Sequence, residues 1–118
     1  MNSGASSSGV PHWWWQRVTA VLLVPLGLWF VFSLLRLDVL DYRYVSDWLT
    51  HPLNALGVAL LMLVLSLHSQ LGVQVVIEDY VHDPARKRFS LVLVGFAHAL
   101  IGVIGVVAII RIAAGGAA

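Results

Sequence analysis

The sequence has 118 residues, of which 59% are hydrophobic and 11% are charged, and its formal net charge is +1. Because a soluble domain carries roughly a quarter of its residues as charges, most of this chain's surface is not expected to face water, and the small net charge gives no general attraction to nucleic acid. The chain has no cysteine, which excludes disulfides, thiolate zinc sites and cysteine-ligated iron–sulfur clusters within it.

The first apolar segment follows a polar N-terminal stretch. Residues 1–11 are rich in serine and glycine and are predicted to form a disordered tail. Residues 18–35 are long enough, at about 1.5 Å per residue, to cross the hydrocarbon core of a bilayer. Residues 13–15 are tryptophans, as in an interfacial aromatic belt, and a proline such as Pro25 is tolerated in membrane helices. Since no lysine or arginine precedes Arg17, we interpret this segment as a retained span and not as a secretory signal.

Two further apolar segments complete the chain. We expect a polar connection at residues 37–52, which lies partly along the membrane surface, and a second span at residues 53–77. A second polar connection at residues 78–88, a third span at residues 89–110 and a C-terminal tail at residues 113–118 follow. The predicted fold is an all-α membrane protein whose three transmembrane helices form one anchor domain over residues 12–112. Because three helices of this size bury little of one another, we expect this domain to be part of a larger hetero-oligomeric helix bundle.

Basic residues in the short flanks predict the orientation. Arg17 and the cluster at residues 86–88 lie on one side of the membrane, and three separate arginines lie on the other. Cytoplasmic flanks carry the excess of lysine and arginine. We therefore place the N-terminus and the connection at residues 78–88 in the cytoplasm, and the C-terminus in the periplasm.

The second span carries a stripe of unusual residues. With about 100° of turn per residue, Gly72 lies about 40° and Asp79 about 20° around the helix from His68. Gly57, eleven residues earlier, belongs to the same face. Tyr80 follows Asp79 a third of a turn away. His68 and Asp79 are separated by about 16 Å along the axis, so an interfacial Asp79 places His68 near the middle of the membrane.

An ionisable side chain at that depth is a functional-site hypothesis by default. A neutral imidazole can bind a metal, and the glycine one turn from His68 opens room for a large flat group. Alternatively, His68 makes only interhelical hydrogen bonds with neighbouring polar residues. One histidine cannot hold a haem iron on both sides, so a second ligand would come from His98 or from another chain.

The other candidate residues also have two interpretations each. Asp79 and Tyr80 are typical of a helix end at the membrane interface, or they form a ligand site in which the tyrosine donates to a carbonyl and the carboxylate relays protons. Arg17 is an interfacial anchor, or a cation that neutralises buried carboxylates. For His98, beside a glycine deep in the third span, we favour helix packing.

Two stretches of the sequence resemble one known family. The segment HSQLGVQVVIEDY, which runs from His68 to Tyr80, resembles the H-x3-G-x6-D-Y signature of the hydrophobic membrane anchor of succinate dehydrogenase, the D-type subunit of respiratory complex II. The stretch WQRVTA at residues 15–20 is similar to that family's R-x-T/S-A entry to its first helix. With the three-span layout, the resemblance covers about residues 12–112.

The resemblance implies a role for each candidate residue. His68 would be an axial ligand of the iron of a b-type haem, paired with a histidine of a C-type anchor subunit, and Gly72 would pack against this haem. Tyr80 would donate a hydrogen bond to a carbonyl of ubiquinone near the cytoplasmic surface, supported by Asp79. Arg17 matches a basic position near the haem propionates and the quinone pocket.

The resemblance also implies partner subunits and a location. The flavin, the iron–sulfur clusters and the succinate site would belong to a flavoprotein subunit and an iron–sulfur subunit, for which residues 78–88 would provide part of the docking surface. The expected function is that of a membrane anchor of succinate:quinone oxidoreductase, in the citric acid cycle and respiratory electron transport, which is not catalytically complete alone. Because the N-terminus shows no arginine-rich transit peptide, we expect a bacterial inner membrane protein.

Two alternatives remain at this point. The chain could be a haem-free structural anchor of a related fumarate reductase. It could also be a small proton-relay or transport protein, since ionisable groups within a membrane suit that function as well.

Overall fold

A computed structural model describes residues 9–115, which form four helices and contain no strand. In chain order these are α1 (Gly9–Leu35), α2 (Tyr42–Thr50), α3 (Pro52–Tyr80) and α4 (Pro84–Ala113). The three long helices α1, α3 and α4 are each long and apolar enough to cross a membrane. The predicted all-α fold with three spans is therefore confirmed.

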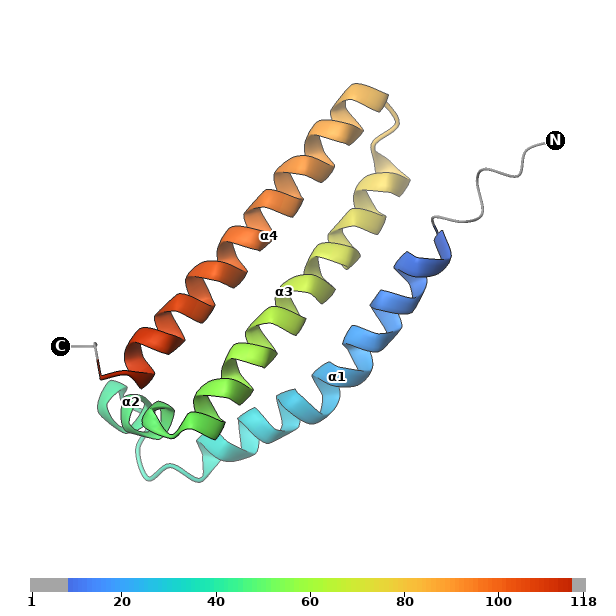
Figure 1. Cartoon of the computed structure of the whole chain (residues 1–118). Coiled ribbons are helices and arrows are strands. Elements are labelled where there is room, and N and C mark those ends of the chain that lie inside the picture. The colour runs from blue at the N-terminus through green and yellow to red at the C-terminus, as the bar shows by residue number, and fades with distance from the viewer. Residues whose placement is uncertain (1–8, 116–118) are drawn as a thin grey trace.

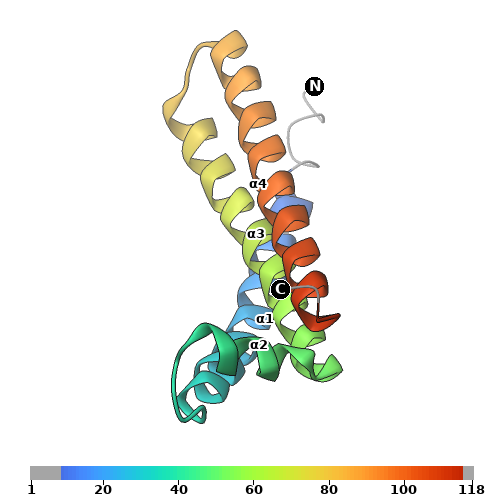
Figure 2. The ribbon, with the colours of Figure 1, turned by 90° about the vertical axis from the view of Figure 1, so that its left-hand side faces the viewer.

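The three long helices lie in one layer with α3 in the middle (Figure 1). α3 contacts α1 on one side and α4 on the other, and α2 packs against both α3 and α4. Figure 2 shows α2 folded across one end of the elongated molecule, whose principal extents are 61 × 27 × 20 Å. The N-terminal end of α1 and the turn between α3 and α4 lie toward the opposite end (Figure 1).

α1 is longer than the apolar segment from which it was predicted. It begins at Gly9, so residues 9–11, which were predicted to belong to a disordered tail, are helical. The apolar pattern marks only the part of a helix that lies in hydrocarbon, and a helix can continue through the interface where the tryptophans lie. The rest of the predicted tail, residues 1–8, lies outside the described residues. α1 bends along its length (Figure 1), as expected for a helix that contains Pro25, whose ring removes one backbone hydrogen bond.

The first polar connection contains the short helix α2. Asp41 caps its N-terminus, and the Asn54 side-chain amide donates a 2.9 Å hydrogen bond to the carbonyl of Trp48 near its end. The ring of Trp48 packs against Trp29 and Phe30 of α1, with ring centroids 5.8 and 6.4 Å apart. α2 therefore ties the end of α1 to the start of α3.

The second connection is shorter than its polar sequence suggested. α3 ends at Tyr80 and α4 begins at Pro84, so most of residues 78–88 are helical. Asp83 accepts a hydrogen bond of 2.9 Å from the backbone N–H of Arg86, and Pro84 occupies the first turn of α4. A capping carboxylate followed by proline is a typical start of a helix, which explains why the polar sequence does not form a longer loop.

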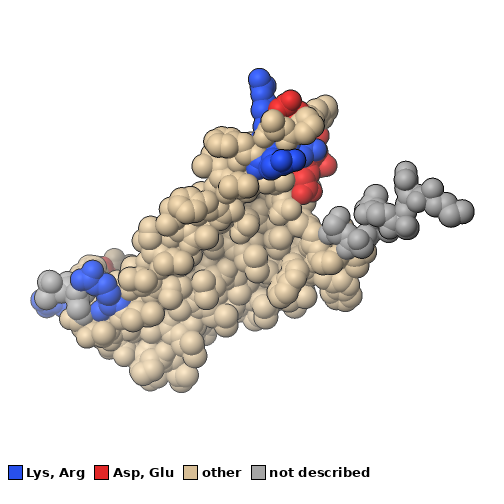
Figure 3. Space-filling view, turned by 45° about the horizontal axis from the view of Figure 1, so that its top comes forward, with Lys and Arg blue, Asp and Glu red and all other residues tan. Residues whose placement is uncertain are grey.

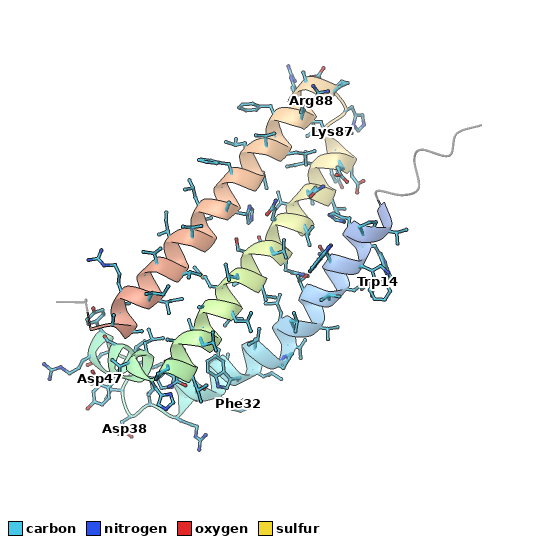
Figure 4. All side chains as sticks on the ribbon, in the orientation of Figure 1. Trp14, Phe32, Asp38, Asp47, Lys87 and Arg88 are labelled. Carbon is cyan, nitrogen blue, oxygen red and sulfur yellow. The ribbon has the colours of Figure 1, made fainter. Side chains whose placement is uncertain are left out.

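Most large apolar side chains are exposed. Within residues 9–115 the buried apolar side chains are those of Leu49, Val64, Leu71 and Ile109. On the face shown in Figure 3, charged side chains gather toward the ends of the molecule, and the surface between them is uncharged. In Figure 4, Asp38 and Asp47 lie at one end and Lys87 and Arg88 at the other. Such a surface suits contact with lipid or with further helices, because it cannot face water.

Candidate functional site

His68 lies in the middle of α3 and faces α1. Its Nδ1 atom is 2.9 Å from the hydroxyl oxygen of Thr19. That hydroxyl is also 2.7 Å from the carbonyl oxygen of Trp15 and 3.1 Å from that of Gln16. Thr19 is 2% exposed and is the one side chain of the described residues that is almost completely buried. No group within residues 9–115 forms a hydrogen bond with Nε2 of His68. Of the two ring nitrogens, therefore, Nδ1 is hydrogen-bonded and Nε2 is not.

Two glycines continue the same face of α3. A Cβ atom placed on Gly57 would lie 2.5 Å from the ring of Trp29, and one placed on Gly72 would lie 3.9 Å from Nε2 of Gln16. Trp29 and Gln16 both belong to α1. The predicted stripe of Gly57, His68 and Gly72 is therefore confirmed as a shared face, and it packs against α1.

The space beside Gly72 differs from the open space that we expected for a large flat group. It is bordered by the side chain of Gln16, whose Oε1 atom is buried without a hydrogen-bond partner among the described residues. Buried polar atoms usually have a partner. This part of the α1–α3 contact therefore leaves one polar atom of Gln16 without a partner, and the packing of haem against Gly72 stays a prediction.

His98 lies on the other side of α3 and has both ring nitrogens engaged. Its Nδ1 is 2.8 Å from the carbonyl of Val94, and its Nε2 is 3.1 Å from the hydroxyl of Ser69 on α3. The hydroxyl of Ser66 donates a further 2.8 Å hydrogen bond to the backbone carbonyl of His98. These contacts join α3 to α4, which agrees with the helix-packing role that we favoured. The structure does not bring His98 to the face of α3 that carries His68.

Asp79 and Tyr80 lie at the end of α3, on a separate level from His68. The helix is continuous from His68 to Tyr80, so the predicted separation of about 16 Å along the axis holds for His68 and Asp79. Both side chains are exposed, and that of Tyr80 is 80% exposed. Tyr80 lines an open pocket at the α3–α4 turn together with Val81, His82, Asp83, Arg86 and Ser90.

Arg17 is not brought together with these residues. It precedes Thr19 by two positions, which places it about 200° away around α1 and therefore on the side that faces away from α3. Its guanidinium carbon lies 5.1 Å from the ring centroid of Trp13, within the range of a cation–π contact. The exposed position beside a tryptophan agrees with an interfacial anchor, and its predicted contact with haem propionates or quinone would have to be made on the outer side of α1.

Thr19 is the residue of this site that the sequence did not single out. It lies within the stretch at residues 15–20 that carried part of the family resemblance, but it received no role of its own. A hydroxyl in an apolar helix is a general hint of a buried hydrogen bond. Its partner, 49 positions away on another helix, could not be read from local spacing.

Comparison with known proteins gives a consistent result. A family model described as "Succinate dehydrogenase/Fumarate reductase transmembrane subunit" matches residues 2–107. Two proteins named succinate dehydrogenase hydrophobic membrane anchor subunit, from Rickettsia bellii and Rickettsia conorii, are 36% and 31% identical to this chain over 80 and 94 residues. The first match covers 68% of this chain and 64% of the Rickettsia bellii protein, which is slightly less than two thirds of that relative. The second covers 79% of this chain and 75% of the Rickettsia conorii protein. A protein of the same name from Paracoccus denitrificans is 30% identical over 98 residues, which cover 83% of this chain and 76% of that protein.

Proposed function

Because the chain is a succinate dehydrogenase membrane anchor subunit and belongs to the family of succinate dehydrogenase and fumarate reductase transmembrane subunits, we propose that it contributes one axial ligand to a b-type haem and part of a ubiquinone-reduction site. In this proposal the two levels of α3 have separate tasks. His68, in the middle of the membrane, binds the haem iron, and Tyr80 with Asp79, at the end of the helix, contacts the quinone.

The state of the two ring nitrogens of His68 carries the haem proposal. A metal-binding histidine usually has one nitrogen hydrogen-bonded to a neighbouring group and the other directed to the metal. His68 meets this requirement, because Thr19 is hydrogen-bonded to Nδ1 and no described residue forms a hydrogen bond with Nε2. The donor chemistry therefore fits a haem iron, which would supply a one-electron carrier within the membrane. The second axial ligand would come from a C-type anchor subunit, since His98 is engaged on the other side of α3.

The exposed end of α3 supports the quinone proposal. The Tyr80 hydroxyl can donate a hydrogen bond to a quinone carbonyl, and the neighbouring Asp79 carboxylate can accept or pass on a proton. Neither side chain is buried by the described chain. The site would thus be completed by partner subunits.

The surface of the molecule supports its role as an anchor. The apolar faces of α1, α3 and α4 are mostly exposed, which leaves surface for a second membrane subunit and for lipid. The start of α4, directly after the α3–α4 turn, carries the basic cluster at residues 86–88 and lies toward the same end as the start of α1 (Figures 1 and 4). In our proposal this end faces the cytoplasm of a bacterium, where the iron–sulfur and flavoprotein subunits dock.

The haem proposal is tested by a pair of variants at matched depth. His68→Ala in the purified complex is expected to remove the b-type haem absorption band. His98→Ala is the control, because it also removes a mid-membrane histidine but one whose nitrogens are both engaged by Val94 and Ser69. It is expected to keep the band and to weaken α3–α4 packing. Haem that persists in His68→Ala, or that disappears only in His98→Ala, would contradict the assignment.

The quinone proposal is tested separately at the other level. Tyr80→Phe removes one hydroxyl and is expected to lower ubiquinone reduction by the complex while succinate oxidation with an artificial acceptor stays unchanged. Tyr44→Phe, at the opposite end of the molecule and also exposed, is the control and should leave both rates unchanged. Equal quinone reduction in the Tyr80→Phe and wild-type complexes would contradict the proposed contact.

One observation would favour the haem-free alternative. A purified complex that contains the flavoprotein and iron–sulfur subunits, reduces quinone at a normal rate and holds no haem would leave the chain as a structural anchor. The proton-relay alternative needs a protein without soluble partners, which the family match disfavours.

A further inference from the structure

Thr19 connects α1 to the Nδ1 atom of His68 on α3. Its hydroxyl lies within hydrogen-bond distance of three atoms, the carbonyl oxygens of Trp15 and Gln16 and Nδ1 of His68. It is also the most completely buried side chain of the described residues. A hydroxyl in this position cannot exchange these partners for water, so the direction of each hydrogen bond is set by these three atoms alone.

The hydrogen count restricts the arrangement. A threonine hydroxyl has one hydrogen to donate and two lone pairs to accept with, and a carbonyl oxygen can only accept. The shortest of the three contacts, 2.7 Å, is the one to the carbonyl of Trp15, a back-bond that threonine often makes in helices. When the hydrogen lies there, the hydroxyl oxygen accepts the N–H of His68 Nδ1. A neutral imidazole with its hydrogen on Nδ1 has its free lone pair on Nε2.

We propose that Thr19 is a positioning residue that holds His68 in the tautomer whose Nε2 atom binds the metal. The inference rests on the proposed function, because it presumes that His68 is an axial ligand. In it, the chain Trp15 carbonyl, Thr19 hydroxyl and His68 Nδ1–H fixes both the tautomer and the ring orientation. It also makes the imidazole a stronger donor to the iron, since a hydrogen bond from the distal N–H raises the basicity of the ligand nitrogen.

His98 provides the internal comparison. Its Nδ1 donates to the carbonyl of Val94, while its Nε2 accepts from the hydroxyl of Ser69. Both histidines lie deep in apolar helices and both contact a hydroxyl of a neighbouring helix. The hydroxyl meets Nδ1 in His68 but Nε2 in His98, and this difference leaves one Nε2 lone pair free and the other occupied.

The test uses two substitutions that separate the hydroxyl from the shape of the side chain. Thr19→Val keeps the branched shape without a hydroxyl, and Thr19→Ser keeps the hydroxyl without the methyl group. In the purified complex, Thr19→Val is expected to lower haem affinity about 10- to 100-fold, raise the haem midpoint potential and shift the low-spin electron paramagnetic resonance signal of the ferric haem. Thr19→Ser is expected to leave all three measurements close to those of the wild type.

A purely structural role for Thr19 would give a different pattern. Ser66→Ala removes another interhelical hydroxyl hydrogen bond, the 2.8 Å contact to the carbonyl of His98, and should leave the potential and the resonance signal unchanged. If Thr19→Val does not assemble, Thr19→Cys replaces the hydroxyl by a weak acceptor of similar size and should show shifts in the same directions. Wild-type potential and signal in whichever of these two variants assembles would overturn the inference.

The outcome for His68 separates this inference from the proposed function. A wild-type complex without haem, or a His68→Ala complex that keeps its haem, overturns the ligand assignment itself and the role of Thr19 with it. If His68→Ala loses haem while Thr19→Val keeps wild-type haem affinity, potential and resonance signal, the assignment of His68 as a ligand stands and only the role of Thr19 is overturned.

Discussion

α1 and α3 approach each other closely at Gly57, and its replacement by alanine gives a prediction of measurable size. A new Cβ atom would lie 2.5 and 2.8 Å from two ring atoms of Trp29. Because carbon atoms in contact lie about 3.5–4.0 Å apart, the ring would have to move by about 1 Å. The same ring packs against Trp48 of α2, at a centroid distance of 5.8 Å, so a shift of the ring would also disturb α2.

The magnitude follows from a comparison with an open glycine. A Cβ atom added to Gly27 would have no heavy atom within 4 Å, so Gly27→Ala should gain up to about 1 kcal/mol of helix propensity. Gly57→Ala gains the same propensity but adds overpacking, which typically destabilises by about 1–3 kcal/mol. The two alanine variants should therefore differ by about 1–3 kcal/mol in stability. This difference should appear as a lower thermal unfolding midpoint of the purified Gly57→Ala complex.

A second substitution identifies the cause. Trp29→Phe removes part of the ring that Gly57→Ala would strike, so the combined variant should lose less stability than the sum of the two single variants. Gly105→Ala meets Cε, Cγ and Sδ of Met62, an unbranched side chain that can change rotamer more easily than a packed indole, and should be milder than Gly57→Ala. Equal midpoints for Gly57→Ala and Gly27→Ala, or strict additivity with Trp29→Phe, would refute the steric reasoning.

Three further predictions concern the α3–α4 contact and the outer side of α1. Asp83→Ala removes the cap that accepts the N–H of Arg86 and should destabilise by about 1 kcal/mol, whereas Asp83→Asn should retain most of the cap; the thermal midpoints of the two complexes check this. Ser66→Ala removes the hydrogen bond to the carbonyl of His98 and should cost about 0.6–1.7 kcal/mol, and an unchanged unfolding midpoint would count against that bond. Arg17→Gln should leave the haem spectrum unchanged if the exposed guanidinium is an interfacial anchor, and a shifted haem potential in this variant would instead support contact with the propionates.

Much of the candidate site followed from local geometry. The angular positions of Gly57, His68 and Gly72 depend on the helical repeat alone, and the structure confirms that they share a face. The position of His68 along α3 and its separation from Tyr80 follow from the rise per residue within one unbroken helix. The family resemblance added possible roles to residues that were already placed relative to one another.

The residues at which the helices begin and end were harder to predict from the sequence. Hydropathy locates the part of a helix that lies in hydrocarbon, so it missed the start of α1 at Gly9, the helix α2 and the helical ends on both sides of residues 81–83. These segments are polar or interfacial, and their helical state depends on caps such as Asp41 and Asp83.

The sequence by itself therefore determined that this protein has three apolar spans, with a histidine near the middle of the second and an acidic–tyrosine pair at its end. These properties depend on composition and on the geometry of a single helix. Only the tertiary structure decided which neighbour each face meets: His68 turns to Thr19 on α1, His98 turns to Ser69 on α3, and Arg17 turns away from both. The register and rotation of packed helices are set by side chains far apart in the chain, and the free nitrogen of His68 is a consequence of that packing.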